Sequence, residues 1–155
     1  MTSNITYRPI GVIHSPLTAR GEGPPQGVFA PDISGEVEVF PEYSKGLTDL
    51  SEFSHLYLLY HFHLASDAEL MKKPFLDEVP HGIFAIRYFN RPNPIGLSVV
   101  RLMGISGPSE NILQVSELDA LDGTPLLDIK PVVPEFDYRQ DVRIGWLEGK
   151  IPEDG

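Results

Sequence analysis

The hexapeptide RPNPIG, Arg91 to Gly96, places an arginine and an asparagine beside two prolines. Each proline fixes its own φ at about −65° and keeps its predecessor out of the α region, so Arg91 and Asn93 are held extended. Side chains that are ordered in advance lose little entropy on binding, and a guanidinium holds carboxylates or phosphates through paired hydrogen bonds. The alternative is a tight turn that leads into a buried strand. Gly96 permits close approach of a ligand or of another part of the chain.

The segment LDALDGTPLLDIKP, residues 118–131, supplies three carboxylates, those of Asp119, Asp122 and Asp128. Its Asp122-Gly123 pair lies between two apolar runs and predicts a turn. Asp128 and Lys130 are two residues apart, so they share a strand face and can form a simple ion pair. Carboxylates in such a segment can also serve acid–base chemistry or face a cationic ligand. The residues alone leave the catalytic group open, with Arg91, Asn93 and Asp128 as candidates.

Histidines alternate with apolar residues in HLYLLYHFH. Strand alternation puts His55, His61 and His63 on one side with Tyr57 and Leu59, and it puts the other side chains on the opposite side: Leu56, Leu58, Tyr60 and Phe62. Two histidines at i and i+2 can share a zinc ion. No third ligand is readable at a suitable spacing, so the alternative is a strand end with partly exposed imidazoles, one of which lines a pocket.

The segment TARGEGPPQG, residues 18–27, has three glycines but not the spacing of a dinucleotide fingerprint. Pro24 and Pro25 also prevent the phosphate-binding helix that such a fingerprint requires. A surface loop is one interpretation. The other is a ligand loop in which Gln26 supplies a hydrogen-bonding side chain among small residues.

Fifteen prolines and 14 glycines divide the chain into short segments and leave little room for long helices. We therefore predict an all-β or mainly β fold, with residues 1–155 forming one domain. A small closed or nearly closed barrel of about seven strands fits the pattern, with short helical turns at 43–50 and 67–72. Segments rich in β-branched and aromatic residues predict the strands: Arg8–His14, Gly35–Phe40, Phe53–His63, His81–Phe89, Leu97–Ser106, Ile112–Leu118 and Val142–Trp146.

The net charge of −10 argues against a broad nucleic-acid surface. A local basic patch is still compatible with it, because Arg87, Arg91, Arg101 and Lys130 lie near the most unusual segments. The absence of cysteine excludes disulfides and thiolate chemistry. No apolar run is long enough to cross a membrane and no signal peptide is visible, so we expect a cytoplasmic protein that does not bind membranes.

Four segments together resemble the TsaA-like family, the S-adenosylmethionine-dependent tRNA N6-methyltransferases of the TrmO type. They are IGVIHSP, FSHLYLLYHFH, FAIRYFNRPNPIGLSVVRL and LDALDGTPLLDIKPVVP. The resemblance extends over about residues 7–137. It implies a small β-barrel methyltransferase that forms a homodimer, with S-adenosylmethionine near the subunit interface. It also implies a tRNA substrate, bound through the local basic patch, in which N6 of threonylcarbamoyl-adenosine beside the anticodon is methylated.

The resemblance also implies a set of cofactor contacts, and from the histidine spacing we expect no metal. The contacts lie in four parts of the chain: Pro25, Gln26 and Gly27; His63 and Leu64; Arg87 and Leu97; and Asp119, Ala120, Leu121 and Asp122. A carboxylate or His63 would accept the N6 proton. Alternatives are a barrel that binds S-adenosylmethionine without this reaction, acting on or sensing another small molecule, and a histidine-based metallohydrolase.

This chain departs from the family pattern before the arginine–proline corner. Where the family reads A-T-R-S-P, Ile86, Tyr88 and Phe89 stand here, so two hydroxyls and a proline are replaced. This difference concerns the substrate side of the predicted pocket more than the cofactor side. The resemblance also implies that longer bacterial members carry an additional C-terminal domain, which we do not expect within these 155 residues.

Overall fold

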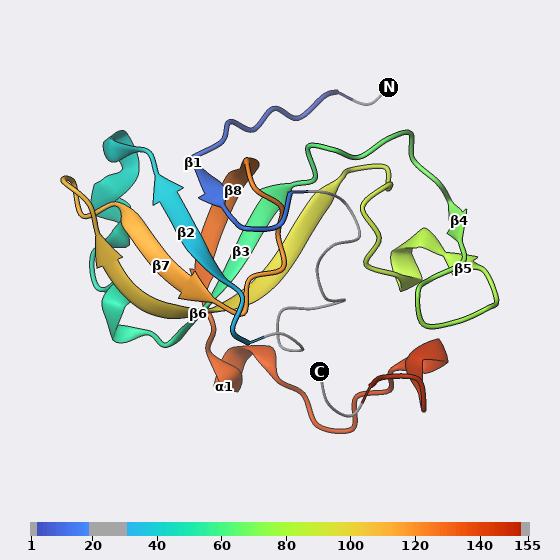
Figure 1. The fold of residues 1–155 in the computed structure, drawn as a ribbon. Helices are drawn as coiled ribbons and strands as arrows, with labels where there is room; N and C mark the ends of the chain where they lie inside the picture. The colour runs from blue at the N-terminus through green and yellow to red at the C-terminus, as the bar shows by residue number, and fades with distance from the viewer. Residues whose placement is uncertain (1–2, 19–30, 153–155) are drawn as a thin grey trace.

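The computed structural model describes residues 3–18 and 31–152, and its centre is a closed antiparallel β-barrel. Neighbouring strands follow the order β1-β2-β7-β6-β3-β8, and β8 closes the barrel by pairing with β1 (Figure 1). Closure pairs the first and last strands of this order, so every barrel strand has a neighbouring strand on both sides. The strands are β1 (Gly11–His14), β2 (Ser34–Val39), β3 (His55–His61), β6 (Ile95–Ser106), β7 (Ile112–Ser116) and β8 (Thr124–Pro131).

The core of the barrel follows from strict alternation along the strands. In β3 the side chains of Leu56, Leu58 and Tyr60 are buried, while their neighbours are half-buried or exposed. In β6 the inward positions are Gly96, Ser98 and Val100. Aliphatic side chains from the other strands and from the β7–β8 loop complete the core: Ile13, Val37, Val39, Leu113, Val115, Leu118, Ala120 and Leu126. Ser98 and Tyr60 therefore bring hydroxyl groups into an otherwise apolar interior.

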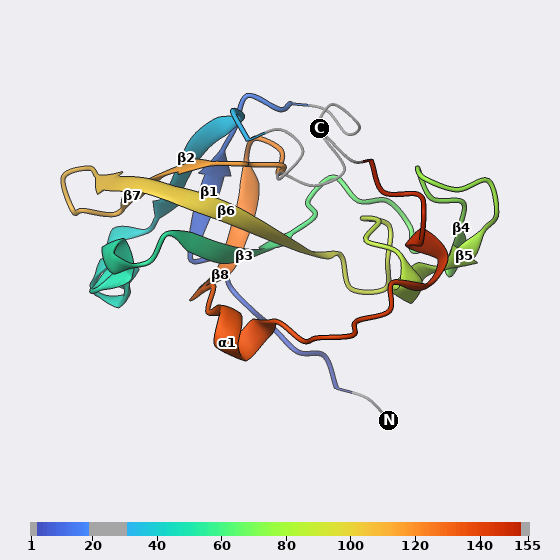
Figure 2. The same cartoon turned by 90° about the horizontal axis from the view of Figure 1, so that it is seen from below.

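A second part of the chain lies beyond one end of the barrel, to the right in Figure 1 and again in Figure 2. It is the connection between β3 and β6, with the short pair β4 (Met71–Lys72) and β5 (His81–Gly82) and the 3-10 helix η4 (Ile83–Ala85). The C-terminal segment runs from α1 (Pro134–Asp137) to the 3-10 helix η5 (Gly145–Leu147) beside this connection. At the other end are the 3-10 helices η2 (Pro41–Leu47) and η3 (Leu50–Glu52).

The predicted mainly β barrel with short helical turns is confirmed, with six strands in the barrel rather than about seven. The predicted turn at 43–50 is confirmed by η2 and η3. The predicted strands do not include β8 as a whole, although Asp128 and Lys130 are predicted to share a strand face, as they do here. The strand β8 contains Pro125 and Pro131. Both prolines lie at the ends of β8, where the ladder tolerates them. No helix in the described part of the chain is long and apolar enough to span a membrane.

Two predicted strands and one helical turn are wrong. The strand His81–Phe89 stops at Gly82, because only the two residues of β4 are available as a partner and Ile86 N–H returns to the Ile83 carbonyl at 3.2 Å. Residues 67–72 form no helical turn, and the last two of them, Met71 and Lys72, form β4. The strand Val142–Trp146 is absent because Asp141 and Gly145 adopt positive φ of 58°. Extended backbone cannot continue through left-handed residues.

Candidate functional site

The β7–β8 loop, residues 117–123, is fixed to the N-terminal segment by its own backbone. Leu118 N–H donates to Ile33 O at 3.1 Å, Asp122 N–H to Leu17 O at 2.7 Å, and Gly123 N–H to Ile13 O at 2.8 Å. The side chains of Leu118 and Ala120 point into the core, and the alternate positions Asp119 and Leu121 are half-buried. The loop therefore presents polar groups on a rigid backbone, which is where a β scaffold usually carries a site.

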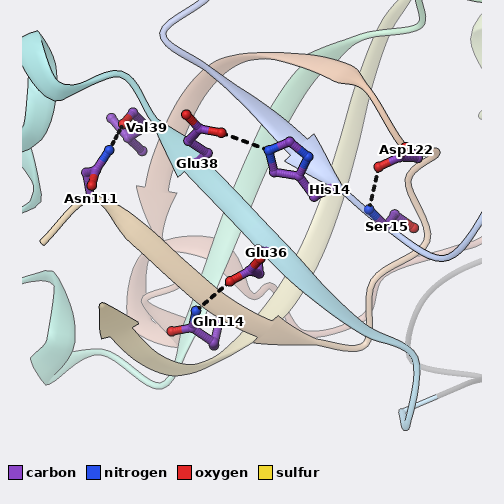
Figure 3. Close-up of polar contacts among 8 residues, drawn as sticks. All are labelled: His14, Ser15, Glu36, Glu38, Val39, Asn111, Gln114 and Asp122. Carbon is purple, nitrogen blue, oxygen red and sulfur yellow. Dashed lines mark hydrogen bonds and ion pairs between the residues drawn. The ribbon is translucent and has the colours of Figure 1, made fainter. Parts of the chain in front are cut away.

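Asp122 closes the loop onto β1. Its Oδ1 accepts a hydrogen bond from Ser15 N–H at 3.0 Å, and Figure 3 shows the carboxylate turned toward that nitrogen. Gly123 follows with a φ of +81°, a conformation that favours glycine. The Thr124 hydroxyl donates to Leu121 O at 2.6 Å. The predicted Asp-Gly turn is thus present, but it does not form a hairpin. It connects β7 and β8, which are not neighbours in the barrel.

Asp119 receives a hydrogen bond from inside the barrel. The Ser98 hydroxyl donates to Asp119 Oδ1, and the Tyr60 hydroxyl lies 2.8 Å from the same Ser98 oxygen. Tyr60 and Ser98 are 5% and 1% exposed, so neither reaches the surface. Burial and the nearby negative charge of Asp119 raise the pKa of Tyr60. The sequence interpretation did not identify these two residues, although each puts a hydroxyl on an inward, otherwise apolar strand face.

His63 lies beside the same loop, just past the end of β3. A methyl group at Gly123 would be 3.9 Å from His63 Nε2, so the imidazole and the loop are in contact range. Burial lowers the pKa of His63 below its ordinary 6.5; the charge of His61 adds to this effect and Asp122 opposes it. His63 is therefore mainly neutral at pH 7 and able to accept a proton.

The arginine–proline corner packs against the end of β3. Phe62 N–H donates to Pro94 O at 2.7 Å, and Ile95 N–H donates to Asn93 O at 2.7 Å. Arg91 Nη1 donates to two carbonyls, Ile86 O at 2.8 Å and Tyr88 O at 3.1 Å. These two bonds use both hydrogens of Nη1 to close the loop before the corner. At least part of the rigidity of RPNPIG is thus structural.

Asn90 is a site-forming residue that the sequence interpretation missed. Its side chain is 7% exposed, and its Oδ1 accepts a hydrogen bond from Ser66 N–H at 2.6 Å. Glu69 N–H also donates to the Asn90 carbonyl at 3.1 Å. Asn90 therefore fixes the chain just after His63 and Leu64. The one signal in the sequence is its place directly after Tyr88 and Phe89 and directly before Arg91.

Aromatic side chains surround this part of the site. Phe62 packs against Tyr60 and Phe89 with ring centroids 5.5 and 6.2 Å apart. Phe89 also packs against Tyr88 at 4.2 Å, and Lys72 Nζ lies 4.5 Å from the centre of the Tyr88 ring. Tyr88 and Phe89, which stand where the family pattern has serine and proline, thus join the aromatic packing around Phe62.

The structure brings some of the predicted site residues together and separates others. Ala120, Leu121 and Asp122 share the loop with Asp119, and His63 adjoins it. Leu97 and Asp128 are both paired with Leu59, one on each side, and they lie on the outer face of the barrel. The other residues are placed as follows: Leu64, Arg87 and Asn93 are exposed, Arg91 is half-buried, and Pro25, Gln26 and Gly27 lie outside the described residues.

Asp128 forms the predicted ion pair, with its Oδ2 3.4 Å from Lys130 Nζ. The basic residues divide into two groups: Arg101 and Lys130 lie on the outer barrel face, and Arg87 and Arg91 lie in the loop before β6.

A cavity of about 450 Å³ lies at the η2 end and is lined by none of the predicted site residues. Within residues 3–18 and 31–152, no group of three His, Cys, Asp or Glu side chains could hold a metal ion.

Fold and site together define a small closed β-barrel that carries its polar groups on loops at one end. This architecture differs from the doubly wound α/β fold of Rossmann-type proteins. Residues 12–138 match the family model described as the tRNA-methyltransferase O N-terminal domain. The chain belongs to this family.

Several relatives cover nearly the whole chain. A Pyrococcus abyssi protein, named a probable S-adenosyl-L-methionine-binding protein, is 57% identical over 95% of this chain and 78% of its own length. The tRNA (adenine(37)-N6)-methyltransferase of Escherichia coli is 34% identical over 94% of this chain and 65% of its own length. A crystal structure of TrmO from Pseudomonas aeruginosa superimposes with a TM-score of 0.80 at 36% identity, over 98% of this chain. The chain spans 65% of that solved chain.

Proposed function

We propose that this protein is an S-adenosylmethionine-dependent methyltransferase and that its acceptor is N6 of threonylcarbamoyl-adenosine beside the tRNA anticodon. The observation that carries the proposal is the rigid β7–β8 loop, which carries Asp119 and places Asp122 and Gly123 beside His63. The names of relatives support the same activity: one is a tRNA adenine N6-methyltransferase and others are S-adenosylmethionine-binding proteins. We expect it to act in the cytoplasm.

The residues of the loop fit such a cofactor chemically. Carboxylates of Asp119 and Asp122 are suitable acceptors for ribose hydroxyls or for an amino group. The backbone of Ala120 and the N–H of Leu121 lie at the same edge, and we assign them to reading the adenine ring; the Leu121 carbonyl is already bonded to Thr124. When bound, S-adenosylmethionine supplies a methyl carbon on a positively charged sulfur, which an aligned nucleophile displaces in line. The chain therefore needs to bind and align, and no covalent enzyme residue is required.

We assign His63 as the base that accepts the N6 proton. The N6 nitrogen must lose a proton as the new N–C bond forms, and a base at hydrogen-bond distance removes it. Burial keeps His63 neutral at pH 7, and an imidazole accepts a proton only in that form. Asp128 fits this role less well, because it lies on the outer barrel face and is paired with Lys130.

We also propose a homodimer with the cofactor near its interface. The outward side chains of Ile95, Leu97 and Val99 form an apolar row along β6, each between 43% and 46% exposed, and Met103 follows beyond Arg101 at 62%. A second copy would remove this row from water. Because Leu97 belongs to both the row and the predicted cofactor contacts, the dimer would bring this surface next to the site. Sedimentation analysis of Val99→Glu, with Glu36→Ala as a control on β2, would test the dimer.

A second candidate is a barrel that binds S-adenosylmethionine without methylating tRNA. It is supported by the archaeal relatives, whose names state binding only, including an Archaeoglobus fulgidus protein that is 39% identical over 98% of its own length. The net charge of −10 also disfavours a polyanionic substrate. Under this alternative the site would act on or sense another small molecule.

One experiment separates these candidates. S-adenosylmethionine is titrated calorimetrically into the full chain, and methyl transfer is then measured with tRNA that lacks only the N6 methyl group. We expect binding and transfer. Binding without transfer would favour the second candidate, and no binding at millimolar cofactor would exclude both.

A further inference from the structure

We propose that Tyr60 and Ser98 are positioning residues of the cofactor site, acting as a directed chain of two hydrogen bonds that orients the Asp119 carboxylate. The inference rests on the proposed function, because it assigns Asp119 to cofactor binding. Neither hydroxyl contacts the ligand in this scheme. Both act through Asp119 from inside the barrel.

The chain of hydrogen bonds crosses from β3 through β6 to the β7–β8 loop. Tyr60 belongs to β3, and its hydroxyl lies 2.8 Å from Ser98 Oγ on the neighbouring strand. Ser98 Oγ in turn donates to Asp119 Oδ1. Tyr60 and Ser98 are almost fully buried, whereas Asp119 is half-buried and lies at the barrel end. The three residues therefore connect the core directly to the proposed binding edge.

The direction of both hydrogen bonds follows from the chemistry of the groups. An ionised carboxylate only accepts, so the single Ser98 proton goes to Asp119. The Ser98 oxygen must then accept from Tyr60. Burial and the charge of Asp119 raise the pKa of Tyr60, so the phenol keeps its proton and remains a donor. The chain thus has one orientation at every pH at which Asp119 is ionised.

Stability alone does not explain two hydroxyls in this core. Apolar side chains of similar shape, such as phenylalanine and alanine, would fill the same space without polar groups to desolvate. Replacing both partners of a buried hydrogen bond by apolar groups can be nearly neutral for folding. What an apolar pair cannot do is fix a carboxylate on an adjacent loop. Binding sites need this support from residues behind those that contact the ligand.

The test is a double-mutant cycle in S-adenosylmethionine affinity, measured by calorimetry on the full chain. We expect Ser98→Ala to weaken binding about tenfold or more, since it removes a hydrogen bond to a charged group, and Tyr60→Phe to weaken it less. In the Asp119→Ala background, adding Ser98→Ala should change the affinity by less than about twofold, because there is no carboxylate left to orient.

Two further variants separate positioning from general damage. Asn111→Ala removes a buried side chain, 4% exposed, that donates to Val39 O at 2.7 Å at the opposite end of β7. It should lower the thermal stability but leave the affinity unchanged. The double variant Tyr60→Phe with Ser98→Ala removes both hydroxyls at once, so neither is left buried without its hydrogen-bond partner. It should fold, and it should bind cofactor at least as weakly as Ser98→Ala.

The outcomes are distinct. Failure of the wild-type chain to bind S-adenosylmethionine would overturn the proposed function and this inference together. Wild-type binding combined with equal losses from Ser98→Ala in the presence and absence of the Asp119 carboxylate would overturn the positioning role alone. An affinity loss in Asn111→Ala as large as that in Ser98→Ala would also overturn it.

Discussion

The ring of Tyr60 lies directly against Gly96 on the neighbouring strand, in a space that no other residue type leaves open. A methyl group at Gly96 would be 2.1 Å from Tyr60 Cε2 and 2.5 Å from Cζ. The two residues are paired across β3 and β6. The glycine at the end of RPNPIG therefore admits a ring from inside the barrel, and this contact places the Tyr60 hydroxyl beside Ser98.

Substitution of Gly96 by alanine should destabilise the barrel and disturb the site. The added methyl has to displace the Tyr60 ring, and overpacking of this kind costs about 1–3 kcal/mol in the free energy of unfolding. Urea unfolding measures this change. Gly104→Ala is the matched control on the same strand, because a methyl there meets nothing within 4 Å, and it should stay within about 0.5 kcal/mol of wild type. Equal effects of the two substitutions would contradict this account.

Arg91→Ala should lower stability as well as turnover. Its Nη1 holds the Ile86 and Tyr88 carbonyls, and loss of hydrogen bonds from a charged donor costs about 1.5–3 kcal/mol. Arg101→Ala, an exposed arginine on β6, should change stability by less than about 0.5 kcal/mol. Unfolding and methyl transfer are measured on the same preparations. If Arg91→Ala unfolded like wild type but lost turnover, the guanidinium would serve the substrate rather than the loop.

The fold was predictable where the alternation of side chains was regular. In HLYLLYHFH the inward set of Leu56, Leu58 and Tyr60 could be read directly, because a strand with one buried face has a period of two. Prediction failed where tertiary contacts replace that pattern. Thr124–Pro131 contains two prolines, yet it is extended because it pairs with β1 and β3 on its two sides. The segment after Gly82 has strand-like residues but lacks a partner strand.

The candidate site was only partly predictable. Asp119, Asp122 and His63 lie in segments whose composition is unusual, and the structure places them at one end of the barrel. Ser98 and Asn90 carry no such signal, because their roles depend on partners 21 and 24 residues away, Asp119 and Ser66 respectively. Leu97 and Asp128 have strand positions that can be read from the sequence. Their place on the outer face follows only from the register with Leu59.

Methyl transfer should retain its rate to a lower pH than an ordinary histidine base would allow. Burial lowers the pKa of His63 below 6.5, so the imidazole stays neutral as the pH falls through 6.5 and becomes protonated only below it. The pH profile of kcat should therefore decline on the acid side below pH 6.5. His63→Gln should remove this decline and lower kcat by about 100-fold.

His61→Gln is the control for this profile. The charge of His61 contributes to the lowered pKa of His63, so its removal should move the acid-side decline slightly upward in pH without abolishing it. A profile in His63→Gln that keeps the wild-type decline would exclude His63 as the base. The lowered pKa of His63 also predicts a stability effect. His63 binds its proton more readily in the unfolded chain, so the free energy of unfolding should rise with pH between the folded-state pKa and 6.5.

Trp146, the single tryptophan, reports on how the C-terminal segment attaches to the β4–β5 connection. Its indole stacks on His81 with ring centroids 4.7 Å apart and donates to Ala85 O at 2.8 Å. Asp77 Oδ2 lies 2.8 Å from His81 Nε2 and 3.6 Å from Lys150 Nζ. None of these residues belongs to the barrel core, so the attachment should open without unfolding the barrel.

His81→Ala should therefore expose Trp146 while the barrel remains folded. We expect a shift of tryptophan emission to longer wavelength and faster quenching by iodide, with an unchanged far-ultraviolet circular dichroism spectrum. Lys150→Ala should have little effect, because it removes only the 3.6 Å contact of an exposed lysine with Asp77. The hydrogen bond from His81 lowers the pKa of Asp77, so the contact is fully present above pH 3.8 and is lost as the pH falls through the lower folded-state value. The emission shift of wild type should thus begin only below pH 3.8. A shift that begins above pH 3.8 would contradict this account.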